Sequence, residues 1–125
     1  MDFMLLTAEM VEAIHDEVLN PGELTGRARD KSLESTLARV ENHIAYGMVR
    51  DIFELAALYA MAVARGHCFN DANKRTAYRS MQVVLELNGR HAPRVSPDEI
   101  GPQIIALAQG AIDDGQLADW LRDRC

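Results

Sequence analysis

Residues 52–75 read IFELAALYAMAVARGHCFNDANKR, and this stretch decides the fold. Its first part, from Ile52 to Arg65, leaves almost no polar face on a helix and contains many alanines. A helix that is apolar all round is surrounded by protein, and small alanines let neighbouring helices approach closely. The sequence therefore predicts a central helix of a bundle, which Gly66 ends and which places His67 at its exit.

The second part of this stretch is a predicted site loop that leads into another helix. Nine residues hold a histidine, a carboxylate, two amides and two adjacent cations, namely His67, Asp71, Asn70, Asn73, Lys74 and Arg75. Core packing does not require so many polar groups together. The alternative is a plain turn whose histidine and aspartate cap helices and whose cations are solvated. The number of groups favours a functional site over that turn.

Helical periodicity and capping signals predict further helices around this centre. No segment requires strand pairing, so we expect one all-α domain over residues 1–125, a bundle of about six helices with the site loop between the third and fourth. The other expected helices are one capped by Thr7 and ended by Asn20-Pro21-Gly22, one from Leu33 to about Gly47, one from about Asn73 to Leu87, one from Ser96 to Gly110, and one from Asp113 or Asp114 that buries Leu117, Trp120 and Leu121.

Four local features of the sequence lead to more specific predictions. Ser96-Pro97-Asp98-Glu99 has the features of a capping box with proline at the first helical position. Gly101-Pro102 predicts a break in the following helix, because proline lacks the amide hydrogen. Residues 90–95 are expected to form a short extended segment. In the loop after the first helix, we expect Arg27 and Arg29 to be solvated rather than to contact a partner or phosphate.

Composition restricts the class of protein. The 125 residues carry a formal net charge of −6, which argues against direct nucleic-acid binding because that needs a basic face. Cys68 and Cys125 are expected to be free thiols, since two cysteines make no disulfide framework. The longest apolar run, Leu55 to Ala64, is about half of the roughly 20 residues that span a bilayer. No signal peptide is apparent, so we expect a cytoplasmic protein without a membrane partner.

The start of the helix after the loop is a predicted anion site. Its amide N–H groups point into the loop, and the helix dipole favours negative charge there. Lys74 and Arg75 lie in this first turn, where cations are unfavourable unless an anion binds. Asp71 beside a phosphate can hold Mg²⁺, and His67 can act as general base on a hydroxyl. Together these groups predict phosphoryl or nucleotidyl transfer.

The loop resembles the signature of the Fic/Doc superfamily, His-x-Phe-x-Asp/Glu-Gly/Ala-Asn-Gly/Lys-Arg, which residues 67–75 match. It is most similar to the Doc (death-on-curing) branch, because Lys74 stands where the wider Fic proteins usually have glycine, and because the chain is small. Weaker similarity in the flanking residues extends from about Leu6 to Gly89. The resemblance implies the Fic-type helical fold.

The resemblance also implies transfer from ATP, with Mg²⁺, to a hydroxyl group of a protein. Wider Fic proteins usually transfer AMP, whereas Doc proteins are toxins of type II toxin–antitoxin pairs that phosphorylate a threonine of elongation factor Tu and inhibit translation. Lys74 would fill space that glycine leaves for the α- and β-phosphates, so that the nucleotide presents its γ-phosphate. We therefore expect a protein-threonine kinase; an AMP transferase and a catalytically idle binding module remain the alternatives.

Carried over by position, the resemblance implies a role for each polar residue of the loop. His67 would be the base and Asp71 the metal ligand, with Lys74 in the catalytic set. The expected phosphate or nucleotide contacts are Asn70, Asn73, Lys74, Arg75, Arg65 and Arg79. From the residues alone, Asn70 and Asn73 can instead support the loop, and Phe69 is expected to point into the core. Arg79 departs from the asparagine that close Doc relatives tend to carry.

The resemblance finally implies a partner that restrains the enzyme. The cis-inhibitory Fic pattern Ser/Thr-x-x-x-Glu-Gly/Asn is absent from the chain. Restraint is therefore expected from an antitoxin that folds as a helix onto a hydrophobic groove. The faces of the first and fourth helices are the preferred place for that groove.

Overall fold

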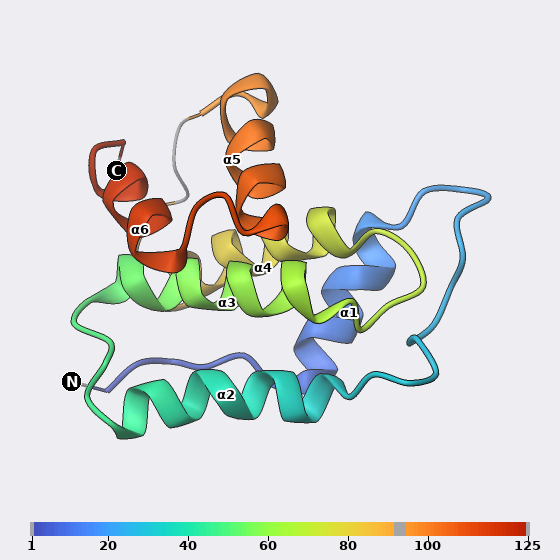
Figure 1. The fold of residues 1–125 in the computed structure, drawn as a ribbon, viewed down its shortest axis with the longest axis horizontal. Helices are drawn as coiled ribbons and strands as arrows, with labels where there is room; N and C mark the ends of the chain where they lie inside the picture. Colours follow the sequence, from blue (N-terminus) through green and yellow to red (C-terminus); the bar gives the residue numbers. More distant parts are fainter. Residues whose placement is uncertain (1, 92–94, 125) are drawn as a thin grey trace.

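The structure, a computed structural model, describes residues 2–91 and 95–124. These residues form helices and no strand, apart from one isolated antiparallel bridge between Arg27 and Phe69, so the all-α prediction is confirmed (Figure 1). None of the described helices has the length and apolar character needed to cross a membrane. The helices are α1 (Ala8–Val18), α2 (Leu33–Ala45), α3 (Ile52–Gly66), α4 (Asn73–Leu87), α5 (Pro97–Gln109) and α6 (Asp114–Arg122).

The helix α3 is the centre of the bundle, as its sequence predicts. It contacts α2, α4, α5 and α6, and Figure 1 shows it running between α2 on one side and α5 with α6 on the other. Its alanines Ala56, Ala57 and Ala60 are fully buried. The Asp51 side chain caps its start by accepting a hydrogen bond from the Glu54 amide. The C-terminal end of α3 leads directly into the site loop.

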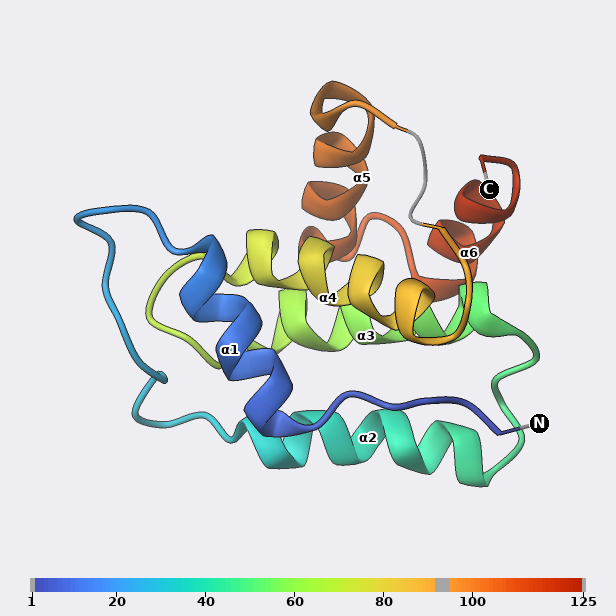
Figure 2. The same cartoon turned by 180° about the vertical axis from the view of Figure 1, so that it is seen from behind.

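The helices α1 and α4 pack against each other, and Figure 2 shows α1 in the foreground, beside the start of α4. Thr7 caps α1 as predicted, because its hydroxyl accepts a hydrogen bond from the Met10 amide. The segment before α1 is held at the core by a hydrogen bond from the Leu6 amide to the Tyr59 hydroxyl, 3.1 Å long. This packing places α1 alongside the loop that joins α3 to α4.

Two predictions about α5 are wrong. The helix continues through Gly101-Pro102, since Pro102 lies only one turn from the start and costs a single backbone hydrogen bond, while Ile100 and Ile104 stay buried. Ser96 makes no side-chain cap, because its hydroxyl contacts the Glu99 carboxylate instead of a backbone amide.

Other predictions for the C-terminal part of the chain are confirmed only in part. Pro97 does begin α5, as predicted. A capping box forms instead at Asp113 and Gln116, at the start of α6. Of the expected extended segment, residues 90, 91 and 95 are not in a strand, and residues 92–94 lie outside the described residues, as does Cys125.

Candidate active site

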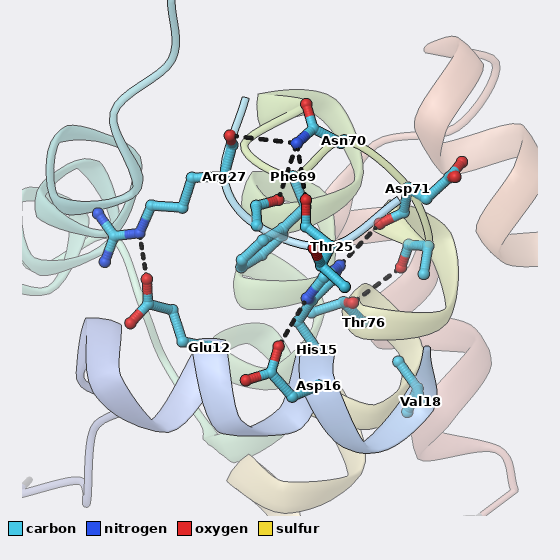
Figure 3. Close-up of polar contacts among 12 residues, drawn as sticks. Glu12, His15, Asp16, Val18, Thr25, Arg27, Phe69, Asn70, Asp71 and Thr76 are labelled. Atoms are coloured by element: carbon cyan, nitrogen blue, oxygen red, sulfur yellow. Dashed lines mark hydrogen bonds and ion pairs between the residues drawn. The ribbon is translucent and has the colours of Figure 1, made fainter. Parts of the chain in front are cut away.

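The site loop joins α3 to α4 and lies against α1 and the α1–α2 loop (Figure 3). Among the described residues, the two non-glycine residues with positive φ are His67, at 50°, and Ala72, at 64°. The left-handed region is unfavourable for a residue with a Cβ atom, and such residues cluster at functional sites where the surroundings enforce the strain. Both ends of the loop are therefore held in an imposed conformation.

Phe69 anchors the middle of the loop in the core, as predicted, with 3% of its surface exposed. The Asn73 side chain holds the Phe69 backbone at both groups: its Oδ1 accepts from the Phe69 amide at 3.1 Å, and its Nδ2 donates to the Phe69 carbonyl at 2.9 Å. The Asn70 Nδ2 donates to the Thr25 carbonyl, and the Asn70 amide donates to Gly26. Both amide side chains thus support the loop.

Gly66 lies where α3 meets this loop, and the space for a side chain there is limited. A Cβ atom on it would lie 3.1 Å from Thr36 Cγ2 and 3.2 Å from the Cys68 Sγ. The Cys68 thiol is free, as predicted. It is also buried, and it lies 3.3 Å from the Thr36 hydroxyl. The left-handed conformation that glycine often adopts after a helix falls instead on His67.

A cavity of about 360 Å³ opens between the loop and the start of α4. His67 is exposed at this cavity. The Oδ2 atom of Asp71 accepts a hydrogen bond from the Leu24 amide at 2.8 Å, and no partner of Oδ1 is found among the described residues. No side chain caps α4 or α5, whereas side chains cap α1, α2, α3 and α6. The structure therefore brings together an imidazole, a carboxylate and an uncapped helix start.

The two cations of the motif have different surroundings. Lys74 is exposed at the edge of the cavity. Arg75 also lines the cavity, but its Nη1 donates to the Val18 carbonyl at 2.6 Å and its Nη2 pairs with the Glu23 carboxylate. Hydrogen bonds from Arg75 and from the Asn20 amide hold the pKa of Glu23 below its usual value. The anion beside Arg75 in this structure is a carboxylate of the protein itself.

The other two arginines expected at the phosphates lie elsewhere. Arg65 donates from Nε to the Leu107 carbonyl at 2.9 Å and from Nη2 to the Ile112 carbonyl at 2.8 Å, so it connects α3 to the end of α5. Arg79 points along α4, with Nη1 3.4 Å from the Glu86 carboxylate. Neither residue lines the cavity.

The expectation for Arg27 is wrong, because it is not simply solvated. Its guanidinium pairs with Glu12 of α1 and with Glu34 of α2, and these hydrogen bonds raise its pKa above the usual value. Arg29 is exposed, as expected. Arg27 therefore fixes the α1–α2 loop, whose backbone pairs with the site loop at Phe69.

Sequence reasoning missed two residues that contact the site, His15 and Glu23. His15 follows Ile14 and lies four residues after Val11, so it occupies a position of the buried face of α1, and a polar residue there could have been noticed. Glu23 lies in an irregular loop, and no local pattern brings it near Arg75.

Residues 5–85, which contain this whole loop and its supports from α1 to α4, match the sequence model of the Fic/DOC family. The chain belongs to this family, and the resemblance of its motif is thereby confirmed. Over 118 residues, 94% of this chain and 92% of the relative, it is 36% identical to "Protein kinase doc" of Escherichia phage P1.

Proposed function

We propose that this protein is a Doc-type toxin that transfers the γ-phosphate of ATP to a threonine hydroxyl of elongation factor Tu and so inhibits translation. The observation that carries the proposal is the meeting of His67, Asp71 and the uncapped start of α4 in one cavity, with Lys74 at its edge. The similarity to a relative named as a protein kinase supports the reaction class. The second candidate is a Fic-type AMP transferase, which would use the same residues.

The proposed step is an in-line transfer in which each group has one task. His67 takes the proton from the threonine hydroxyl as the new oxygen–phosphorus bond forms. The bond between the γ-phosphorus and the bridging oxygen breaks, and ADP leaves with that electron pair. The amides at the start of α4 and the Lys74 ammonium balance the phosphate charge. Catalysis of this kind depends mostly on positioning and charge neutralisation.

The residues fit Mg²⁺ bound through Asp71. Among the described residues, no group of three or more histidine, cysteine, aspartate or glutamate side chains could hold a metal. Magnesium that binds with a nucleotide typically uses one or two carboxylates and completes its shell with phosphate oxygens and water. Asp71 Oδ1 is available for this bond, while Leu24 holds Oδ2. When bound, the ion would neutralise charge on the phosphates.

Lys74 is the reason to prefer phosphate transfer over AMP transfer. Its side chain stands at the first turn of α4, where glycine would leave the anion site open. In the proposed arrangement it occupies the place of the α- and β-phosphates, so the nucleotide enters with its γ-phosphate toward the start of α4. Arg75 would contact phosphate only after its pair with Glu23 opens.

The proposed partner is an antitoxin that binds as a helix. The preferred surface, the faces of α1 and α4, is not open, because these helices pack on each other and bury Val11 and Ile14. An apolar groove of about 270 Å³ lies instead between α4 and α5, next to Lys74, and Ile105 on its edge is 45% exposed. We assign the antitoxin helix to this α4–α5 groove; Ile105→Glu should weaken antitoxin binding without loss of kinase activity.

Intact-mass analysis tests the proposed reaction. Purified protein, ATP, Mg²⁺ and elongation factor Tu should give a phosphate-sized increment, which peptide mapping assigns to a threonine. A nucleotide-sized increment would establish AMP transfer instead. No increment, under conditions where the protein binds ATP, would indicate the idle binding module. Asp71→Asn serves as control, because it removes the metal ligand and should remove either increment.

A further inference from the structure

His15 is a buried polar side chain to which the proposed reaction gives no task. It lies on α1, is 1% exposed, and points toward the site loop (Figure 3). It does not line the cavity that His67 lines. Its ring stacks on Phe69, with centroids 4.0 Å apart and planes 8° from parallel. Its Nε2 atom lies 2.9 Å from the carbonyl oxygen of Asp71. Two residues of the loop therefore contact one imidazole.

The direction of this hydrogen bond follows from its partner. A carbonyl oxygen only accepts, so Nε2 of His15 carries a proton and donates it. The other nitrogen, Nδ1, lies 3.3 Å from the Asp16 carboxylate, whose side chain is 76% exposed. That contact is long and solvated, so the bond to Asp71 is the main polar restraint on the ring.

The accepting carbonyl belongs to the peptide that leads into Ala72. Ala72 has a φ of 64°, and a left-handed residue with a Cβ atom persists only where neighbouring groups fix the backbone. The Asp71 side chain is held separately, by the Leu24 amide at 2.8 Å from Oδ2. His15 thus fixes the backbone of Asp71, and Leu24 fixes one oxygen of its carboxylate.

We propose that His15 is a positioning residue: its Nε2 donor sets the peptide after Asp71 and thereby the direction of the Asp71 carboxylate. This placement of the carboxylate is argued from the contacts of His15 and Leu24 and does not depend on the proposed function. Its consequence for Mg²⁺ rests on the proposed function, in which Asp71 is the metal ligand.

Two substitutions separate the donor from the ring. His15→Phe keeps an aromatic ring against Phe69 but removes the donor. His15→Gln places an amide nitrogen near the former Nε2 position but removes the ring. Amide hydrogen exchange of Leu24, measured by NMR, reports the carboxylate position, because that amide donates to Asp71 Oδ2. In His15→Phe we expect the Leu24 amide to exchange about tenfold faster than in the wild type, a change typical of one lost hydrogen bond. In His15→Gln we expect its exchange rate to stay near the wild-type value.

A remote amide and global unfolding serve as controls. The Arg90 amide donates to the Leu85 carbonyl at the other end of α4, and its exchange should not change. Equal Leu24 exchange in wild type and His15→Phe would overturn the proposal. So would equal acceleration in both variants, since the ring and not the donor would then hold the loop. If His15→Phe does not fold, His15→Gln against His15→Ala provides the same comparison.

Metal binding supplies the second measurement. Mn²⁺ affinity, measured by electron paramagnetic resonance with a non-hydrolysable ATP analogue, should fall several-fold in His15→Phe and recover in His15→Gln. The Mg²⁺ concentration for half-maximal transfer should rise in parallel, with little change in kcat at saturating Mg²⁺. Unchanged Mn²⁺ affinity in His15→Phe would refute the effect on metal. A wild type that neither binds Mn²⁺ nor phosphorylates would refute the proposed function, while Leu24 exchange would still decide the role of His15.

Discussion

His67 combines two properties that are seldom found together in a structural residue. It holds a strained left-handed conformation at the end of a rigid helix, and its side chain is exposed at the cavity. Because the His67 side chain contributes nothing to the core, the backbone strain is not offset by packing of that side chain. Such strain indicates that the direction of the side chain matters. Both properties support the proposed role of His67 as the general base.

His67→Ala should reduce phosphate transfer by about 10²- to 10⁴-fold, the usual contribution of a general base. Urea unfolding should show no loss of stability, because the exposed ring supports nothing in the core. Initial rates of phosphorylation measure the first effect. His43→Ala on α2, outside the cavity, should retain full activity. Full activity in His67→Ala would exclude it as the base.

At the scale of elements, the α1–α2 loop and the site loop depend on each other. The backbone of residues 26–28 pairs with residues 68–70, and Arg27 fixes the first loop between α1 and α2. Glu23 of the same loop reaches across to Arg75 of α4. The protein thus provides its own carboxylate at a place assigned to phosphate.

Glu23→Gln should bind ATP more tightly than the wild type, because Arg75 is freed for phosphate. The lowered pKa of Glu23 keeps the pair intact at neutral pH, and the pair opens only as pH falls through that lowered value. Calorimetric titration with ATP measures the change. Glu17→Gln, which alters a distant contact with Arg79, should bind ATP as the wild type does. Weaker binding in Glu23→Gln would show that Arg75 has a purely structural role.

Two helical glycines should respond in opposite ways to alanine. Gly66→Ala places its Cβ atom against Thr36 and Cys68 and should destabilise by about 1–3 kcal/mol, as other overpacked sites do. Gly101→Ala meets no atom within 4 Å in α5 and should stabilise by about 0.5–1 kcal/mol. Free energies of unfolding in urea provide the test. Similar shifts in both variants would mean that space around Gly66 is not limiting.

On the scale of the whole molecule, an ion cluster connects the last helix to the centre of the bundle. Arg122 of α6 pairs with Asp51 and with Glu54 at the start of α3. Burial opposes ionisation of the Asp51 carboxyl, but hydrogen bonds from Arg122 and the Glu54 amide outweigh it and hold its pKa below the usual value. For Glu54, burial is likewise outweighed by hydrogen bonds from Arg50, and its pKa is also lowered.

Removing Arg122 should therefore make stability depend on pH in a defined way. A lowered folded pKa stabilises above the unfolded value, near pH 4, and this stabilisation is lost as pH falls through the folded value. Arg122→Gln should be less stable than the wild type at pH 7, with the difference shrinking below pH 4. Thermal unfolding across pH 2–8 tests this, with Arg39→Gln on the exposed side of α2 as control. A difference that is independent of pH would assign the effect of Arg122 to packing.

The sequence alone determined those features of the structure that depend on residues close together along the chain. Three such local features gave correct predictions. The apolar run of α3 predicted the central helix, and the Thr7 cap predicted the start of α1. The cluster of polar residues at 67–75 predicted the loop that carries the motif. Local rules also failed locally: Pro102 did not break α5, because the buried face of that helix outweighs one lost hydrogen bond.

Only the tertiary structure decided how the motif is held. His15 and Asp71 are 56 residues apart, Glu23 and Arg75 are 52 apart, and Arg65 reaches Leu107 across 42. Such pairs meet because α1, α4 and α5 pack around α3, and no periodicity or cap encodes their contact. The motif in the sequence shows which chemical groups are present, whereas the packing of the helices determines which of these groups face the cavity and which support the loop.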